Sequence, residues 1–127
     1  MKKFYNKKNY SKLKWAELAG KHIIFTTPSE CIRHLENPVK ILEFWDKVVE
    51  THHWCRGSDP KLHKRERVVN DIKPSAGYMH SGYPIVTHLD CCQRECNECI
   101  FDLEKLAVNG NWGLFVRLIL SLILTTI

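Results

Sequence analysis

Apolar residues recur with helical spacing in the second quarter of the chain. Five of them fall at positions i, i+1, i+4, i+7 and i+8, on one face of a helix: Ile41, Leu42, Trp45, Val48 and Val49. Asn37-Pro38 precedes them with a capping side chain and a proline suited to the first turn. The pattern predicts a helix from residue 38, with Trp45 as a core anchor in preference to an exposed recognition residue.

β-Branched and aromatic residues predict three short strands, at residues 22–27, 67–72 and 83–89. Proline cannot donate a hydrogen bond to a sheet, so Pro84 indicates that the third segment is an edge strand or that a strand begins there. The polar stretch 51–65 and the Gly-bounded stretch 75–82 are expected to be loops.

Two shorter helices are also expected. Thr27, Pro28 and Glu30 have the spacing of a capping box, which predicts a short helix from residue 28 to about residue 35. A second helical face ends at Asn109-Gly110-Asn111, and its members are Cys99, Ile100, Leu103, Leu106 and Ala107. The predicted order of elements, β-α-α-β-β-α, indicates a mixed α+β fold.

Length and charge narrow this picture. The chain has 127 residues, enough for one hydrophobic core, and a formal net charge of +5. Six lysines and no acidic residues lie in residues 1–14, which leaves thirteen basic and fourteen acidic residues in the rest. Residues 1–14 are therefore expected to be a basic flexible lead-in, capable at most of peripheral contact with an anionic membrane. A nucleic-acid partner is not expected, because the body of the chain has no basic excess.

Neither end of the chain has a targeting or spanning segment of the usual kind. Polar residues follow Met1, so no secretory signal peptide is predicted, and a reducing compartment is expected for the six cysteines. The apolar run 114–127 has 14 residues and contains Arg117, whereas a bilayer span needs about 20 residues. The expected location is the cytoplasm, peripheral to the plasma membrane, with a tail anchor as the alternative.

The strongest candidate for metal chemistry is a cysteine cluster, Cys91-Cys92-x-x-x-Cys96-x-x-Cys99. A Cys-x-x-Cys pair can supply half of a zinc site, but a second pair at the usual distance is missing from the sequence. If residues 92–107 are helical, Cys92, Cys96 and Cys99 share one face. Structural thiols are the preferred interpretation, and metal binding and redox chemistry are the alternatives.

The histidines and serines give weaker signals. The seven histidines include no pair four residues apart, so the His-Glu-x-x-His zinc motif does not occur in the sequence. His52, His53, Cys55 and His63 offer a possible site in the predicted loop, with a solvated loop as the alternative. Ser75, His80 and Ser81 lack an indicated orienting acid. No catalytic, metal-binding or cofactor-binding residue is therefore predicted.

Several segments together resemble the TRP (melastatin cold-sensing) channel-associated factors, which contain an enhancin-like, gluzincin-type peptidase domain. The resemblance covers residues 15–113 and implies the N-terminal part of a zincin-type domain, incomplete in this sequence. It also implies binding to a TRP-type cation channel and an influence on its surface delivery or gating. The segments that carry the resemblance are Trp15-Ala16-Glu17-Leu18, Ile23–Pro28, Ile41-Leu42-x-Phe44-Trp45-Asp46, Arg65–Ile72, Ser75–Ile85 and His88-Leu89.

The sequence departs from this family at residue 114. In the family, the Trp-Gly pair that matches Trp112-Gly113 leads into the zinc-binding helix, whereas Leu114-Phe115 follows here. No metal or catalytic residue of the family can be carried over, so a non-catalytic fragment is expected. The alternative is a mucin- or glycoprotein-peptidase-like protein that has lost its catalytic half.

Residues 114–127 are interpreted as an aberrant apolar tail of a truncated isoform. Val116-Arg117 is compatible with codons that resemble a splice donor, which suggests translated intron sequence as a hypothesis. Without the zinc helix, the apolar sides of strands 67–72 and 83–89 are expected to lie open and to make the chain poorly soluble. In the alternative, the tail folds back over them as a strand or helix.

Overall fold

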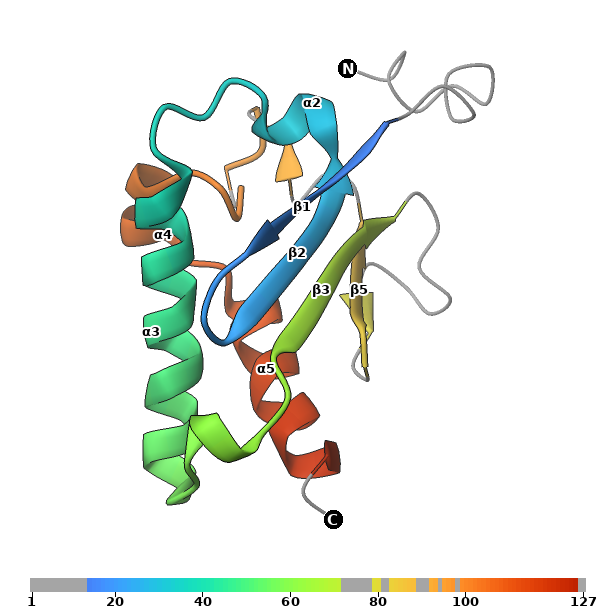
Figure 1. Cartoon of the computed structure of the whole chain (residues 1–127). Coiled ribbons are helices and arrows are strands. Elements are labelled where there is room, and N and C mark those ends of the chain that lie inside the picture. Colours follow the sequence, from blue (N-terminus) through green and yellow to red (C-terminus); the bar gives the residue numbers. More distant parts are fainter. Residues whose placement is uncertain are drawn as a thin grey trace.

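One mixed β-sheet organises the protein. The computed structural model describes residues 14–71, 79–80, 83–88, 92–93, 95–97 and 99–125. Within them the sheet has five strands in the order β1-β2-β3-β5-β4 (Figure 1). The strands are β1 (Trp15–Ala19), β2 (Ile23–Pro28), β3 (Glu66–Asp71), β4 (Met79–His80) and β5 (Ile85–His88). The helices are α2 (Ser29–Ile32), α3 (Pro38–Arg56), α4 (Leu103–Asn109), α5 (Trp112–Thr125) and the short 3-10 helix η2 (Pro60–Leu62). This arrangement confirms the predicted α+β class.

The central strands of the sheet are parallel. β2 pairs with β3, and β3 pairs with β5, in parallel. The outer pairs are antiparallel: β1 pairs with β2, and β4 pairs with β5. The three predicted strands correspond to β2, β3 and β5. The edge position proposed for the third is wrong, because β5 lies between β3 and β4. Pro84 immediately precedes β5, so the strand-start alternative is the correct one.

Helix α3 supplies the largest part of the core on one side of the sheet. Asn37 caps it by accepting a hydrogen bond from the Lys40 backbone N–H at 3.3 Å, as predicted. Trp45 is fully buried and packs edge-on against Phe25 of β2. The loop predicted for 51–65 is wrong at its start, because α3 continues to Arg56. The helix ends where Gly57 adopts a φ of 81°, a left-handed conformation that favours glycine.

The two shorter helices begin later than the sequence indicates. Pro28 still belongs to β2, and α2 starts at Ser29 without a side-chain cap, so the capping box at Thr27 is wrong. Helix α4 starts at Leu103, where Asp102 accepts a hydrogen bond from the Lys105 N–H. The expected loop 75–82 contains the two-residue strand β4; its other residues lie outside the described part of the chain.

Residues Trp112–Thr125 form helix α5, which lies behind the sheet and beside α3 (Figure 1). Asn111 accepts a hydrogen bond from the Leu114 N–H at 3.0 Å and so caps the helix. Leu114 and Leu118 are buried in the same core as Val68 and Ile85. The apolar sides of β3 and β5 are therefore covered, and the fold-back alternative is confirmed as a helix. Of residues 1–14, only Lys14 is described.

A buried carboxylate joins α3 to the β1–β2 hairpin. Asp46 accepts hydrogen bonds from the backbone N–H groups of Lys21 at 2.9 Å and His22 at 2.8 Å. A side chain at Gly20 would lie 2.7 Å from the same carboxylate. The turn therefore requires both the carboxylate of Asp46 and the absence of a Cβ at residue 20. Asp46 belongs to one of the segments that carry the family resemblance.

Replacing Asp46 with alanine is expected to lower the free energy of unfolding by about 1.5–3 kcal/mol, because it leaves two turn N–H groups without their charged acceptor. Urea unfolding followed by circular dichroism measures this change. Glu43→Ala on the exposed side of α3 is the control, and it is expected to change stability by less than about 0.5 kcal/mol. Equal effects of the two substitutions would contradict the anchoring role of Asp46.

Candidate functional site

Two buried cysteines from distant parts of the chain meet beside the carboxyl end of β2. Cys31 lies on α2 and Cys92 in the segment before α4, and their Sγ atoms are 3.0 Å apart. Both side chains are almost inaccessible to solvent. Cys92 donates its S–H to Cys31. No sequence motif connects these residues, because 61 positions separate them.

The two thiols differ in proton affinity. The hydrogen bond from Cys92 lowers the pKa of Cys31 below its ordinary value, with a smaller contribution from Thr27 and an opposing one from burial. The same hydrogen bond, together with burial, raises the pKa of Cys92. The proton therefore stays on Cys92, and Cys31 is the thiol that ionises more readily.

The other cysteines do not complete a metal site. Cys92, Cys96 and Cys99 do not share a helical face, because α4 begins only at Leu103. Cys99 is buried, which raises the pKa of its thiol to about 11, and Cys96 is half-buried. Among the described residues, no three His, Cys, Asp or Glu side chains gather closely enough to hold a metal ion. Cys91 lies outside the described residues.

Polar side chains line the edge of the sheet beside this cysteine pair. The carboxyl ends of the parallel strands β2, β3 and β5 meet there, as the topology of a parallel sheet requires. Thr27, Asn70 and Thr87 are fully buried at these ends. Asn70 donates a hydrogen bond from Nδ2 to Thr87 Oγ1 at 2.6 Å. Polar groups therefore enter the interior at this edge of the sheet.

Two of the four residues proposed as a loop site lie together at the end of α3. His53 is buried; its ring centre lies 4.9 Å from that of His63, and its Nδ1 is 2.7 Å from Ser58 Oγ. Burial, and then the neighbouring His63, lower the pKa of His53. Cys55 is exposed. Ser75, Ser81 and the side chain of His80 lie outside the described residues.

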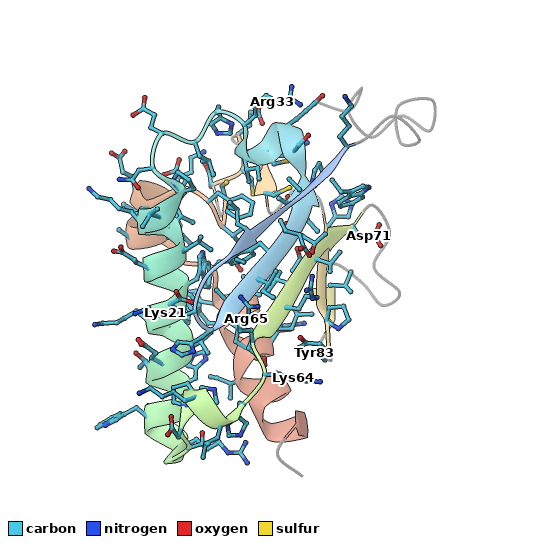
Figure 2. The ribbon with its side chains drawn as sticks, in the orientation of Figure 1. Lys21, Arg33, Lys64, Arg65, Asp71 and Tyr83 are labelled. Atoms are coloured by element: carbon cyan, nitrogen blue, oxygen red, sulfur yellow. The ribbon has the colours of Figure 1, made fainter. Side chains whose placement is uncertain are left out.

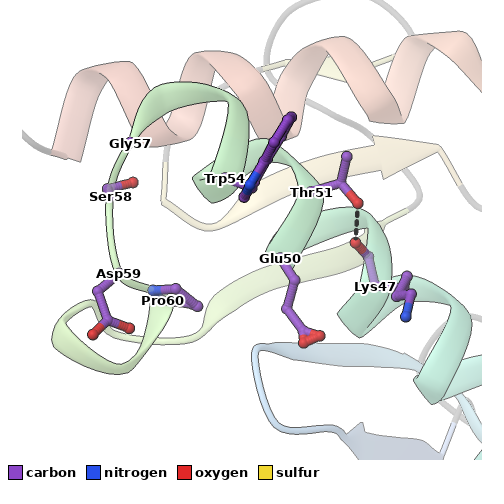
Figure 3. A pocket seen from close by; sticks show the side chains of 8 residues that line it. All are labelled: Lys47, Glu50, Thr51, Trp54, Gly57, Ser58, Asp59 and Pro60. Atoms are coloured by element: carbon purple, nitrogen blue, oxygen red, sulfur yellow. Dashed lines mark hydrogen bonds between the residues drawn. The ribbon is translucent and has the colours of Figure 1, made fainter.

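An open groove runs beside this histidine pair. It has a volume of about 650 Å³ and lies between the last turns of α3 and the Gly57–Pro60 turn (Figure 3). Trp54 stands along its wall, and Glu50 and Asp59 give it acidic groups. The groove has no arrangement of nucleophile, base and orienting acid among these residues.

The sheet face opposite the helices carries a charged cluster that no sequence motif indicated. Arg67 Nη1 lies 2.6 Å from Glu17 Oε2 and also donates to Thr26 Oγ1 at 3.1 Å. The hydrogen bond from Arg67 lowers the pKa of Glu17. Next to this cluster, Lys64 lies over the ring of Tyr83 at 3.8 Å from its centre (Figure 2). Basic side chains thus gather at one end of the sheet.

The comparisons with known proteins define the class to which the chain belongs. Residues 2–115 match the family described as peptidase M60, enhancin and enhancin-like, and the chain belongs to this family. No helix of the described residues is long and apolar enough to span a membrane. No solved structure matches the chain.

The curated relatives are TRPM8 channel-associated factors, as the resemblance predicted. The chain is 39% identical over 99 residues to the "TRPM8 channel-associated factor homolog" of Xenopus laevis and 37% identical over 99 residues to "TRPM8 channel-associated factor 1" of Homo sapiens. The homolog of Danio rerio is 40% identical over the same length. Each match covers 78% of this chain and 10% of the relative, so the chain spans about a tenth of these proteins.

Proposed function

We propose that this chain acts in a channel-associated factor: it binds a TRP-type cation channel and modulates the channel's surface delivery or gating, without peptidase chemistry. The similarity to proteins named as TRPM8 channel-associated factors is the observation that carries this proposal. Its place of action is the cytoplasm, at the periphery of the plasma membrane, where the lysines of residues 1–14 add attraction to anionic lipid.

A non-catalytic role is consistent with the chemistry of the chain. Water activation by a gluzincin-type peptidase needs a metal held by histidines at helical spacing. The sequence has no pair of histidines four residues apart. In the described part of the chain His53 and His63 lie together, and they face Ser58 and the backbone carbonyl of Asp59.

The open face of the sheet is the proposed contact surface for the channel. The helices cover the opposite face, and Lys64 and Arg65 project from the end of this one (Figure 2). Both side chains are exposed. Arg65 also donates a hydrogen bond to the Gly20 carbonyl at 3.2 Å, which fixes the guanidinium at the β1–β2 turn. Charged side chains at the rim of an interface, such as Lys64 and Arg65, steer the association of two proteins.

Co-precipitation of the complete chain with TRPM8 from cells that express both proteins tests the proposal. The wild type is expected to bind, and the pair Lys64→Glu and Arg65→Glu to lose most of the bound channel. The pair Lys40→Glu and Lys47→Glu makes the same change of charge on exposed positions of α3 and is expected to bind normally. Failure of the wild type to bind would overturn the function, and equal loss in both pairs would overturn the proposed surface.

A further inference from the structure

Cys31 and Cys92 lie close enough for a disulfide bond to form between them after a small movement. Their Sγ atoms, 3.0 Å apart, lie about 1 Å beyond the length of a disulfide bond. A small approach of α2 toward the segment before α4 closes this gap. The exposed thiol, Cys55, lies at the far end of α3 and has no such neighbour among the described cysteines.

We propose that Cys31 and Cys92 are a redox modification site: a peroxide converts them to an intramolecular disulfide, and thiol reductants reverse the reaction. The proposal goes beyond channel binding and does not depend on it. The cross-link would fasten α2, at the carboxyl end of β2, to the chain that leads into α4 and α5. Oxidation would thus tie together the two segments that border the polar edge of the sheet.

The two thiols have distinct roles in this reaction. The thiolate of Cys31 attacks one oxygen of hydrogen peroxide, the O–O bond breaks, and the sulfenic acid forms. The hydroxide that leaves takes up the proton that Cys31 gave up on ionising, which gives the first water. Cys92 then attacks Cys31 Sγ, the S–S bond forms, and the sulfenic hydroxyl leaves and takes up the proton of Cys92. Two thiols and one peroxide give one disulfide and two waters, so the peroxide is the only oxidant required.

Solvent exposure and the hydrogen bond between the two thiols favour this assignment of roles. Cys31 is 6% exposed and Cys92 is not exposed, so a small oxidant reaches Cys31 first. Cys92 donates its S–H to Cys31 across 3.0 Å, which supports a thiolate at the attacking position and keeps the second thiol next to it. Peroxide is the appropriate probe, because larger disulfide reagents would need the surrounding side chains to open.

Peptide mapping of the complete chain tests the site directly. The reduced protein is treated with hydrogen peroxide, the remaining thiols are alkylated, and trypsin is added. Cleavage after Lys21, Arg33, Arg67 and Arg94 places Cys31 in peptide 22–33, and Cys91 and Cys92 together in peptide 68–94. We expect a cross-link between these two peptides that dithiothreitol removes. Cys55, in peptide 48–56, is expected to remain separate from both.

Matched variants identify the partner of Cys31. Cys91→Ser is expected to retain the cross-link and Cys92→Ser to abolish it, which separates the two neighbours within one peptide. Mixing isotopically heavy and light chains before oxidation shows whether the bond joins one chain or two. The proposal is overturned if wild-type Cys31 stays fully alkylatable, if it pairs with Cys91, Cys96 or Cys99, or if the bond joins separate chains. The cross-link in the wild type is the deciding result, so the test remains valid even if one of the variants fails to fold.

Discussion

Replacing Trp45 with alanine is expected to lower the free energy of unfolding by about 3–5 kcal/mol, the usual cost of removing a large aromatic side chain from a core. Trp45 is fully buried, and its ring packs against those of Phe25, Phe44 and Phe115. Its indole N–H also donates to the Ile100 carbonyl at 2.8 Å. Domains are stable by about 5–15 kcal/mol, so this loss would remove a large part of the total stability. Urea unfolding followed by far-ultraviolet circular dichroism measures the change.

A second tryptophan on the same helix provides the control. Trp54 is 80% exposed, and Trp54→Ala is expected to change stability by less than about 0.5 kcal/mol. Trp45→Phe keeps an aromatic ring but leaves the Ile100 carbonyl unpaired, which is expected to cost about 1–3 kcal/mol. Similar losses for Trp45→Ala and Trp54→Ala would show that Trp45 does not hold α3 against the sheet.

The sequence predicted those elements whose own residues determine them. The apolar period around Trp45 identified α3 and its buried face, because a long helix repeats its pattern several times. The β-branched runs identified β2, β3 and β5 for a similar reason. β1 carried no such signal: the sequence Trp-Ala-Glu-Leu-Ala has no β-branched residue, and it forms a strand because it pairs with β2.

The extension of α3 beyond residue 50 also depends on tertiary contacts. Residues Thr51–Arg56 are mostly polar, so their pattern favoured a loop. In the structure the Thr51 hydroxyl donates to the Lys47 carbonyl at 2.7 Å, and His53 is buried against Ser58 and His63. A helix whose outer side faces solvent tolerates polar residues there. The residue that ends α3 is Gly57.

The Cys31–Cys92 pair was also predicted only in part, because it depends on a contact between distant parts of the chain. Spacing along the chain drew attention to the cysteines between residues 91 and 99, because local motifs are what a sequence displays. The partner of Cys92 is Cys31, and α3, β3 and β5 lie between the two residues along the chain. The carboxylate of Asp46 and the ion pair of Glu17 with Arg67 likewise join residues that no short motif connects.

Segment 114–127 was expected to be an aberrant tail, but part of it is buried in the core. Its apolar composition and departure from the family suggested an aberrant tail, and its origin in translated intron sequence stays a prediction about the transcript. In the structure, Leu114 and Leu118 enter the core from α5, and Phe115 lies 5.6 Å from Trp45 between ring centres. These positions follow helical spacing, so the apolar run supplies a buried face as well as exposed residues.

If α5 is an integral part of the fold, Leu118→Ala is expected to lower the free energy of unfolding by about 2–5 kcal/mol, because it removes a buried side chain and leaves a cavity. Leu118 is 1% exposed, whereas the adjacent Ile119 is 44% exposed. Ile119→Ala changes a side chain of the same size one position along the helix and is expected to have a much smaller effect. The same urea titration of both variants measures the difference. Two equal and small effects would mean that α5 does not cover the sheet in solution, and β3 and β5 would then lose the cover that Leu114 and Leu118 provide.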